Sequence, residues 1–342
     1  MTAVVTTTGT ARREHGGVAA IALGAAVVFL FVASLAVGRS GLGLLGLLQR
    51  ASGEDAETVA LILREIRLPR AILAVLVGMA LGLAGAALQG LLRNPLAEPG
   101  LIGASGAAAL GAVAALYFGL SGLFALALPL GGLAGSFLAV ALLYAIAGRE
   151  GGVLTLILAG IALNSFTAAL TALLLNLAPS PYAVQEIVHW LLGSLADRSF
   201  DQVWLAGPFI LVGAALMLAD GRALDALALG EDTAESLGFH LAAVRWRVIL
   251  GAAMAVGAAV SVTGVIGFVG LVVPHLLRPL VGYRPSALLP LSALGGAALT
   301  LASDIALRLL PSQFELKLGV VTALVGAPFF LFLVLKLRRS VE

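Results

Sequence analysis

The feature that most constrains this sequence is a repeated apolar run of membrane-spanning length. The segments 17–38 and 153–176 contain no charged residue. About 20 apolar residues in a helix cross the hydrocarbon core of a bilayer, and lipid offers backbone groups no other hydrogen-bond partner, so such runs form helices. The sequence therefore predicts an all-α polytopic membrane protein with about ten spans, at 17–38, 70–92, 104–120, 123–147, 153–176, 202–219, 245–263, 265–281, 286–310 and 317–336.

Composition supports this class and excludes others. Of the 342 residues, 61% are hydrophobic and 11% are charged, whereas soluble domains average about 25% charged residues. A soluble fold of this length could not bury so much apolar surface in one core. The formal net charge of +2 argues against nucleic-acid binding, and the absence of cysteine excludes a disulfide or a thiolate metal site.

The first apolar run superficially resembles the core of a signal peptide, because it follows Arg12 and Arg13. It is longer than the usual core of about 7–15 residues and lacks a clear cleavage site, so we expect a retained span preceded by a tail at 1–16. Ten spans place both termini on one side. With the N-terminus inside, twelve of the 20 lysines and arginines fall on cytoplasmic segments, which the positive-inside rule favours.

Small residues recur every four positions along the second span. Gly78, Gly82, Ala86 and Gly90 share one helix face, and this spacing lets helix backbones approach closely in a membrane. We expect a packing seam there. Gln89, beside the seam, is a candidate for lining a transport pathway.

The stretch from 89 to 112 breaks the apolar pattern. Arg93-Asn94-Pro95 ends the second span, since proline disfavours helix at the preceding residue. Pro99-Gly100 predicts a turn, and a helix rich in small residues resumes from about Ala104. The spacing leaves two interpretations open: a plain reverse turn, or a turn that positions a helix against a partner or pore.

The chain has no recognisable energy source of its own. The phosphate-binding pattern G-x-x-x-x-G-K-[ST] is absent, and the only lysines are Lys317 and Lys336. We expect a partner to hydrolyse ATP, with this chain making and breaking no covalent bond. An ion-coupled carrier usually needs carboxylates near the midplane, and few are present. An intramembrane enzyme is disfavoured, because the sequence shows no paired catalytic acids, no Ser-His pair and no set of metal ligands.

Asp304 is one of the few carboxylates within a predicted span, since it lies well inside the ninth. Arg308 follows four residues later, so the two side chains share a helix face and can pair. We expect this pair to be structural.

The longest polar segment expected in the cytoplasm runs from about 220 to 245. Glu231, Asp232 and Glu235 are flanked there by leucines, and Gly238 is a natural helix end. The pattern predicts two short helices. Leucines beside carboxylates favour docking against a partner over a solvated loop.

Cations also gather on the side predicted to be outer. Arg64, Arg67 and Arg70 follow each other at intervals of three residues, and Arg308 lies at the outer end of the ninth span. Two interpretations of these arginines are open. They attract an electrostatic partner, or they are helix-end side chains that extend their charges toward the membrane surface.

Long motifs give the sequence a family resemblance. RLPRAILAVLVGMALGLAGAALQGLLRNPLAEPGLIGAS (67–105) resembles the signature of the FecCD-type permeases of ABC importers, which carry iron-siderophores, haem and vitamin B12. Further matches follow in the family's order: LTLILAGIALN (154–164), WLLGSL (190–195), LALGEDTAESLG (227–238), GVIGFVGLVVPHLLRPLVGYRP (264–285), ASDIALRLL (302–310) and ELKLGVVTALVGAPFFLFLV (315–334). Lys317 departs from the proline that many members have.

The resemblance implies a type II ABC importer permease fold, with 1–342 as a single transmembrane domain in the bacterial inner membrane. It implies a second permease subunit, most simply a homodimer, two cytoplasmic ATP-binding subunits, and a periplasmic or lipoprotein binding protein. The chain would hold no cofactor or metal, because ATP and Mg²⁺ belong to the ATPase. The implied cargo is a metal chelate, iron-siderophore or haem, with vitamin B12 as the alternative.

The resemblance also assigns roles to particular residues. For ATPase coupling they are Leu229, Gly230, Glu231, Asp232, Thr233, Ala234, Glu235, Leu237 and Gly238. For binding-protein docking they are Arg67, Arg70 and Arg308. For the translocation pathway the candidates are Gln89, Asn94, Asn164, Thr167 and Thr171, the last three on the span that lines the pathway in the family.

Overall fold

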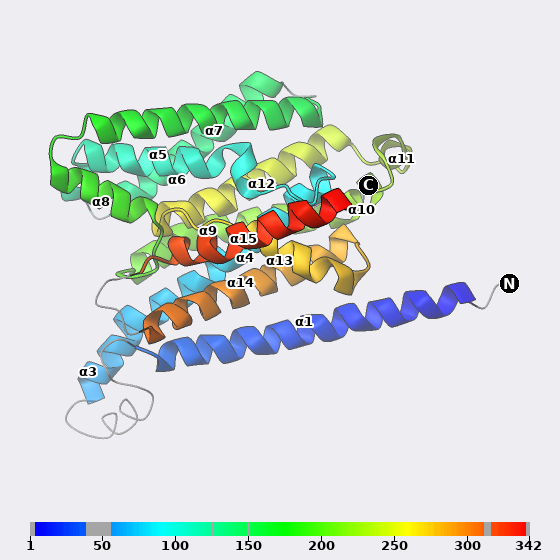
Figure 1. Ribbon diagram of the computed structural model, residues 1–342, viewed down its shortest axis with the longest axis horizontal. Coiled ribbons are helices and arrows are strands. Elements are labelled where there is room, and N and C mark those ends of the chain that lie inside the picture. Colours follow the sequence, from blue (N-terminus) through cyan, green and yellow to red (C-terminus); the bar gives the residue numbers. More distant parts are fainter. Residues whose placement is uncertain (1–3, 39–55, 125, 149–150, 311–315, 340–342) are drawn as a thin grey trace.

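The computed structural model describes residues 4–38, 56–124, 126–148, 151–310 and 316–339, and it is a helical bundle whose long helices run side by side (Figure 1). The main helices are α1 (Val4–Ala36), α4 (Leu68–Leu91), α5 (Ala104–Tyr117), α6 (Ala127–Ala147), α7 (Val153–Asn176), α9 (Phe200–Ala219), α12 (Leu241–Thr263), α13 (Val269–Leu277), α14 (Pro285–Leu309) and α15 (Leu318–Arg339). The shorter elements are α3 (Ala56–Leu61), the π-helix η1 (Ile62–Arg67), α8 (Pro181–Leu191), α10 (Gly221–Leu227), α11 (Glu231–Ser236), and the 3₁₀ turns η2 (Pro99–Ile102), η3 (Leu120–Gly122) and η4 (Arg278–Val281).

The predicted spans agree with these helices. Among the described residues, seven helices are long and apolar enough to cross a membrane, and three shorter apolar helices stand at the remaining predicted spans. The all-α polytopic fold is therefore confirmed. The first residues of α1 and the last of α15 lie at the same end of the bundle as α11 (Figure 1), which fits an even number of spans.

Several boundaries differ from the prediction, among them the starts of α6 at Ala127 and of α12 at Leu241, each four residues from the predicted position. The first helix begins at Val4, so most of the predicted tail at 1–16 continues α1. Helix α8, an 11-residue amphipathic segment capped by the Ser180 side chain, was not predicted. The eighth span begins at Val269, because 264–268 is non-helical.

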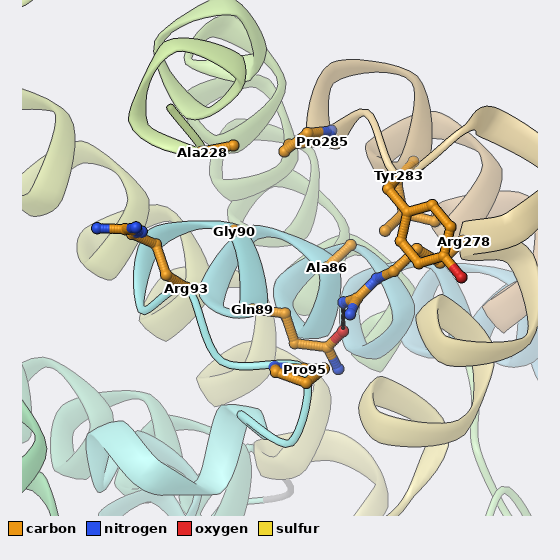
Figure 2. Close-up of a pocket in the computed structure, with 10 residues that line it drawn as sticks. Ala86, Gln89, Gly90, Arg93, Pro95, Ala228, Arg278, Tyr283 and Pro285 are labelled. Carbon is orange, nitrogen blue, oxygen red and sulfur yellow. Dashed lines mark hydrogen bonds between the residues drawn. The ribbon is translucent and has the colours of Figure 1, made fainter. Parts of the chain in front are cut away.

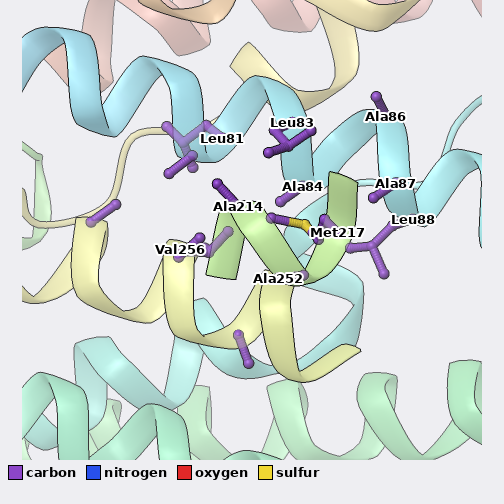
Figure 3. Close-up of a cluster of buried hydrophobic side chains, with 14 of the residues drawn as sticks. Leu81, Leu83, Ala84, Ala86, Ala87, Leu88, Ala214, Met217, Ala252 and Val256 are labelled. Carbon is purple, nitrogen blue, oxygen red and sulfur yellow. The ribbon is translucent and has the colours of Figure 1, made fainter. Parts of the chain in front are cut away.

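Helix α4 is the centre of the bundle, and the glycine seam predicted on it packs against α14. A Cβ atom added at Gly78 would lie 2.3 Å from the carbonyl oxygen of Gly296, and one at Gly82 would lie 2.1 Å from that of Ser292. The two backbones are therefore in direct contact. Leu83 and Leu88 are fully buried, in a cluster that brings together α4, α9 and α12 (Figure 3).

Helix α1, in contrast, stands at the edge of the bundle beside α14 (Figure 1). From Gly16 onward most of its surface is uncovered, and large side chains such as Ile21 and Phe29 are exposed. An apolar helix that the protein does not cover is suited to a lipid environment.

The segment that follows α4 is folded into the protein. Helix α4 ends at Leu91, η2 leads to Gly103 in a left-handed conformation, and α5 then begins. Ala97, Pro99 and Ile102 are buried. The Glu98 carboxylate accepts a hydrogen bond of 3.0 Å from the backbone N–H of Phe268, just before α13. The turn is therefore packed into the protein itself, and a role in positioning a helix against a partner or pore stays a prediction.

Candidate functional site

The segment predicted to dock a partner forms the two expected short helices, α10 and α11. Gly230, at φ +120°, opens α11, and Gly238, at φ +87°, follows its end. The Phe239 N–H donates to the Ala234 carbonyl at 3.1 Å, and the Gly238 N–H donates to the Glu235 carbonyl at 2.8 Å. This pair of bonds is the Schellman arrangement that terminates helices at glycine, so the predicted helix end at Gly238 is confirmed.

The outer surface of this segment is both apolar and acidic. Leu229 and Leu237 are exposed by 71% and 61%, and they flank the exposed Asp232 and Glu235. The other residues predicted for coupling divide by position: Asp232, Thr233, Glu235 and Gly238 are exposed, Gly230 and Glu231 are half-buried, and Ala234 is fully buried. Ala234 anchors α11, and its neighbours form a free surface.

Three carboxylates fasten the segment to the bundle. Asp220 accepts two hydrogen bonds from the Arg247 guanidinium of α12. Glu231 pairs with Arg245 of the same helix at 2.8 Å. Asp225 accepts from both the N–H and the hydroxyl of Ser286, at 2.8 and 2.6 Å, at the start of α14. Sequence reasoning missed these contacts, because their partners are distant along the chain.

A cavity of about 270 Å³ lies beside this segment, between the ends of α4 and α10 and the start of α14. Figure 2 shows Arg278 pointing toward Gln89, whose side-chain oxygen accepts its hydrogen bond. The Gln89 amide also donates to the carbonyls of Ala97 and Gly270, at 3.2 and 3.3 Å. Gln89 therefore joins three segments at the wall of the cavity. Asn94 is exposed and accepts from the backbone N–H of Leu96.

The three pathway candidates of α7 occupy successive turns of that helix. Thr167 is buried, Thr171 is half-buried and Asn164 is exposed. A Cβ atom at Gly106 of α5 would lie 2.4 Å from the Asn164 side-chain oxygen and 2.8 Å from the Thr167 hydroxyl. Asn164 and Thr167 thus face α5, and their role in a pathway stays a prediction.

The predicted docking arginines lie at the opposite end of the bundle, around Asp304. This carboxylate is 1% exposed. It accepts from Arg70 at 2.8 and 3.1 Å and pairs with Arg308 at 3.0 Å. The structural pairing of Asp304 with Arg308 is therefore confirmed, and Arg70 of α4 is a second partner that the sequence did not indicate.

Arg67 and Arg308 also bind the end of α1. Arg308 donates to the carbonyls of Ser34 and Val37, at 2.8 and 2.7 Å, and Arg67 donates to those of Leu35 and Ala36. The last carbonyls of a helix lack intrahelical partners and carry partial negative charge. Cations at this end of the bundle therefore cap α1. Arg67 and Arg308 are buried, so their docking role stays a prediction.

Comparisons with known proteins agree with this arrangement. A model of the FecCD transport family matches residues 26–336. The hemin transport system permease protein of Yersinia pestis is 38% identical over 324 residues, which cover 93% of this chain and 96% of that protein. The vitamin B12 import system permease protein of Vibrio cholerae is 42% identical over 278 residues, covering 81% of this chain and 83% of that protein.

A solved structure described as an inward-facing conformation of a metal-chelate type ABC transporter superposes with a TM-score of 0.81. It is 34% identical in sequence, and the match covers 94% of this chain and 99% of that one. The chain therefore belongs to the FecCD transport family, and it is a multi-pass membrane transport permease with the type II ABC importer fold. The resemblance identified from the motifs is confirmed.

Proposed function

We propose that this chain is the membrane-spanning permease subunit of an ATP-driven importer for a metal chelate in the bacterial inner membrane. Haem or an iron-siderophore is the leading cargo, and vitamin B12 is the alternative. The hemin permease of Yersinia pestis, which matches over nearly its whole length, supports haem. The vitamin B12 permease of Vibrio cholerae supports the alternative. All three cargoes are chelated metals.

The observation that carries this proposal is the exposed surface of α10 and α11. Leu229 and Leu237 project from a segment that also presents Asp232 and Glu235. Apolar side chains among charges are typical of a protein-binding surface. Because the sequence contains no phosphate-binding loop, ATP hydrolysis belongs to two ATP-binding subunits that dock here. This end of the bundle, with both termini, then faces the cytoplasm.

A second copy of the chain completes the pathway. Helix α15 exposes Leu324, Val325 and Phe332, and a largely apolar groove of about 690 Å³ lies beside it. Val265 and Phe268 of the non-helical segment before α13 line this groove. Non-helical backbone at membrane depth is stable where protein or a water-filled cavity covers it. A homodimer would provide that cover and enclose the pathway, with Asn164, Thr167 and Thr171 as candidates for its wall.

A periplasmic or lipoprotein binding protein delivers the cargo at the other end. Within the cluster of Arg67, Arg70, Arg308 and Asp304, three positive charges face one carboxylate, which favours an acidic docking surface. Arg70, whose side chain is 20% exposed, would contact the partner, while Arg67 and Arg308 would act mainly through the field of the cluster.

Uptake into proteoliposomes tests the proposed function. The chain is reconstituted with its ATP-binding subunit and binding protein, and uptake of haemin, a ferric siderophore and cyanocobalamin is compared with and without ATP. We expect uptake of one chelate that requires ATP and both partners. Uptake by the chain alone, driven by a proton or sodium gradient, would instead identify a secondary transporter.

A further inference from the structure

Helix α14 begins without a cap of its own. Its flanking residue Arg284 makes no side-chain capping bond, and Pro285 occupies the first helical position. The first N–H that needs a partner is therefore that of Ser286. It is satisfied by Asp225, a residue of α10 that lies 61 positions earlier in the chain.

The contact between Asp225 and Ser286 is a joint between two elements. The carboxylate binds the N–H and the hydroxyl of Ser286 through its two separate oxygens, and Arg284 lies 3.5 Å from it. A negative charge at a helix N-terminus is also favoured by the helix dipole. The backbones are close as well: a Cβ atom at Gly221, the first residue of α10, would lie 3.2 Å from Ser286.

The far end of α14 belongs to the arginine cluster. Its Asp304 binds Arg70 of α4, and its Arg308 binds the end of α1. The glycine seam holds α14 against α4 over the length between. At about 1.5 Å per residue, a helix of 25 residues spans about 37 Å. Helices α4 and α14 therefore form one rigid pair that joins the docking surface of α10–α11 to the opposite end of the bundle.

We propose that Asp225 is a positioning residue that fixes the α10–α11 segment to the start of α14, so that ATPase movement is passed to the α4–α14 pair. The inference rests on the proposed function, because it assumes that an ATPase docks on this segment. It assigns to Asp225 a role different from docking, since this side chain faces α14 and is only 26% exposed.

The test compares Asp225→Ala, Asp225→Asn and Ser286→Ala in the reconstituted transporter, with Asp201→Ala as the matched control. Asp201 is an exposed aspartate near the start of α9. ATPase binding, ATP hydrolysis and substrate uptake are measured together. In Asp225→Ala we expect ATPase binding and hydrolysis to continue while uptake per ATP falls about tenfold, the effect of losing one charge-assisted hydrogen bond. Asp225→Asn keeps an acceptor for the Ser286 N–H and should be intermediate.

The outcomes are distinguishable. Unchanged uptake per ATP in Asp225→Ala would overturn the inference, as would loss of ATPase binding in all three variants, because Asp225 would then only shape the docking surface. If wild type and Asp201→Ala show no ATP-dependent uptake, the proposed function itself fails. Thermal unfolding and gel filtration identify a variant that does not fold. If an Asp225 variant does not fold, the test relies on Ser286→Ala, which removes only one hydroxyl.

Spin labels give a second, independent measurement. The sequence contains no cysteine, so Arg222→Cys on α10 and Ala287→Cys on α14 can be labelled selectively. We expect the distance between the labels to be the same in the nucleotide-free and ATP-bound transporter. A distance that changes with nucleotide would show that α10 moves independently of α14 and would contradict the inference.

Discussion

At the scale of single residues, the most consequential side chain is Asp304. It is nearly fully buried and balances Arg70 and Arg308. Removing one partner of a buried ion pair leaves an uncompensated charge, which is more destabilising than the pair is stabilising. Asp304 therefore maintains the junction of α1, α4 and α14.

This position gives a prediction for stability. Asp304→Asn should lower the free energy of unfolding by about 3–5 kcal/mol, because two arginines lose their counter-charge in a buried site. The measurement is denaturant unfolding of the purified chain in detergent. Arg64→Ala is the control, since the Arg64 pair with Glu65 is exposed and should change stability by at most about 1 kcal/mol. Equal stability of the two variants would contradict the assignment.

The sequence predicted residue contacts only where they are local. The Asp304–Arg308 pair follows from a spacing of four residues. The bonds of Arg67 to Leu35 and of Asp225 to Ser286 join residues 32 and 61 positions apart, and no pattern along the chain indicates them. The surplus of cations on the predicted outer side was visible in the sequence. That two of them cap α1 could be learned only from the fold.

At the scale of elements, span boundaries were predicted well where charge or proline marks them. The segments 153–176 and 286–310 agree with α7 and α14 to within a residue. The break after Thr263 was predicted as the single residue 264, because the residues that follow are as apolar as the spans around it, but it extends over 264–268. Partners from elsewhere satisfy its edges: Ser194 donates to the Thr263 carbonyl at 2.7 Å, and Glu98 accepts from Phe268.

The seam between α4 and α14 gives a second prediction. A Cβ atom at Gly296 would lie 2.0 Å from the carbonyl oxygen of Gly78, so Gly296→Ala must separate the helices. Overpacking of this kind costs about 1–3 kcal/mol. Gly24→Ala is the matched control, because α1 leaves open space around Gly24. We expect the unfolding temperature of Gly296→Ala to be well below that of Gly24→Ala. The reverse order would contradict close packing of α4 against α14.

The capping of α1 gives a third prediction. Arg67→Ala removes the donors to the carbonyls of Leu35 and Ala36, while Arg308 still binds those of Ser34 and Val37. Amide hydrogen exchange should then accelerate in the last turn of α1 by about tenfold, the effect of one net hydrogen bond, and stay unchanged in α12. Acceleration throughout the bundle would instead indicate general unfolding.

At the scale of the whole molecule, the permease has two polar ends joined by tightly packed helices. One end presents the exposed leucines and carboxylates of α10–α11, and the other holds the arginine cluster. The family, the fold and the existence of the α10–α11 segment could be predicted from motifs and composition. The rigid connection between the ends could not, because it depends on glycine contacts between helices far apart in the sequence.

The central claim is that an ATPase drives transport through the α10–α11 surface. The most direct measurement is stimulation of the cognate ATP-binding subunit by the chain in nanodiscs, comparing wild type with the double variant Asp232→Lys and Glu235→Lys, two positions whose side chains are exposed. We predict that charge reversal abolishes both binding and stimulation, while the chain remains folded. If the double variant binds and stimulates the ATPase as well as wild type does, the coupling surface lies elsewhere and the account is wrong.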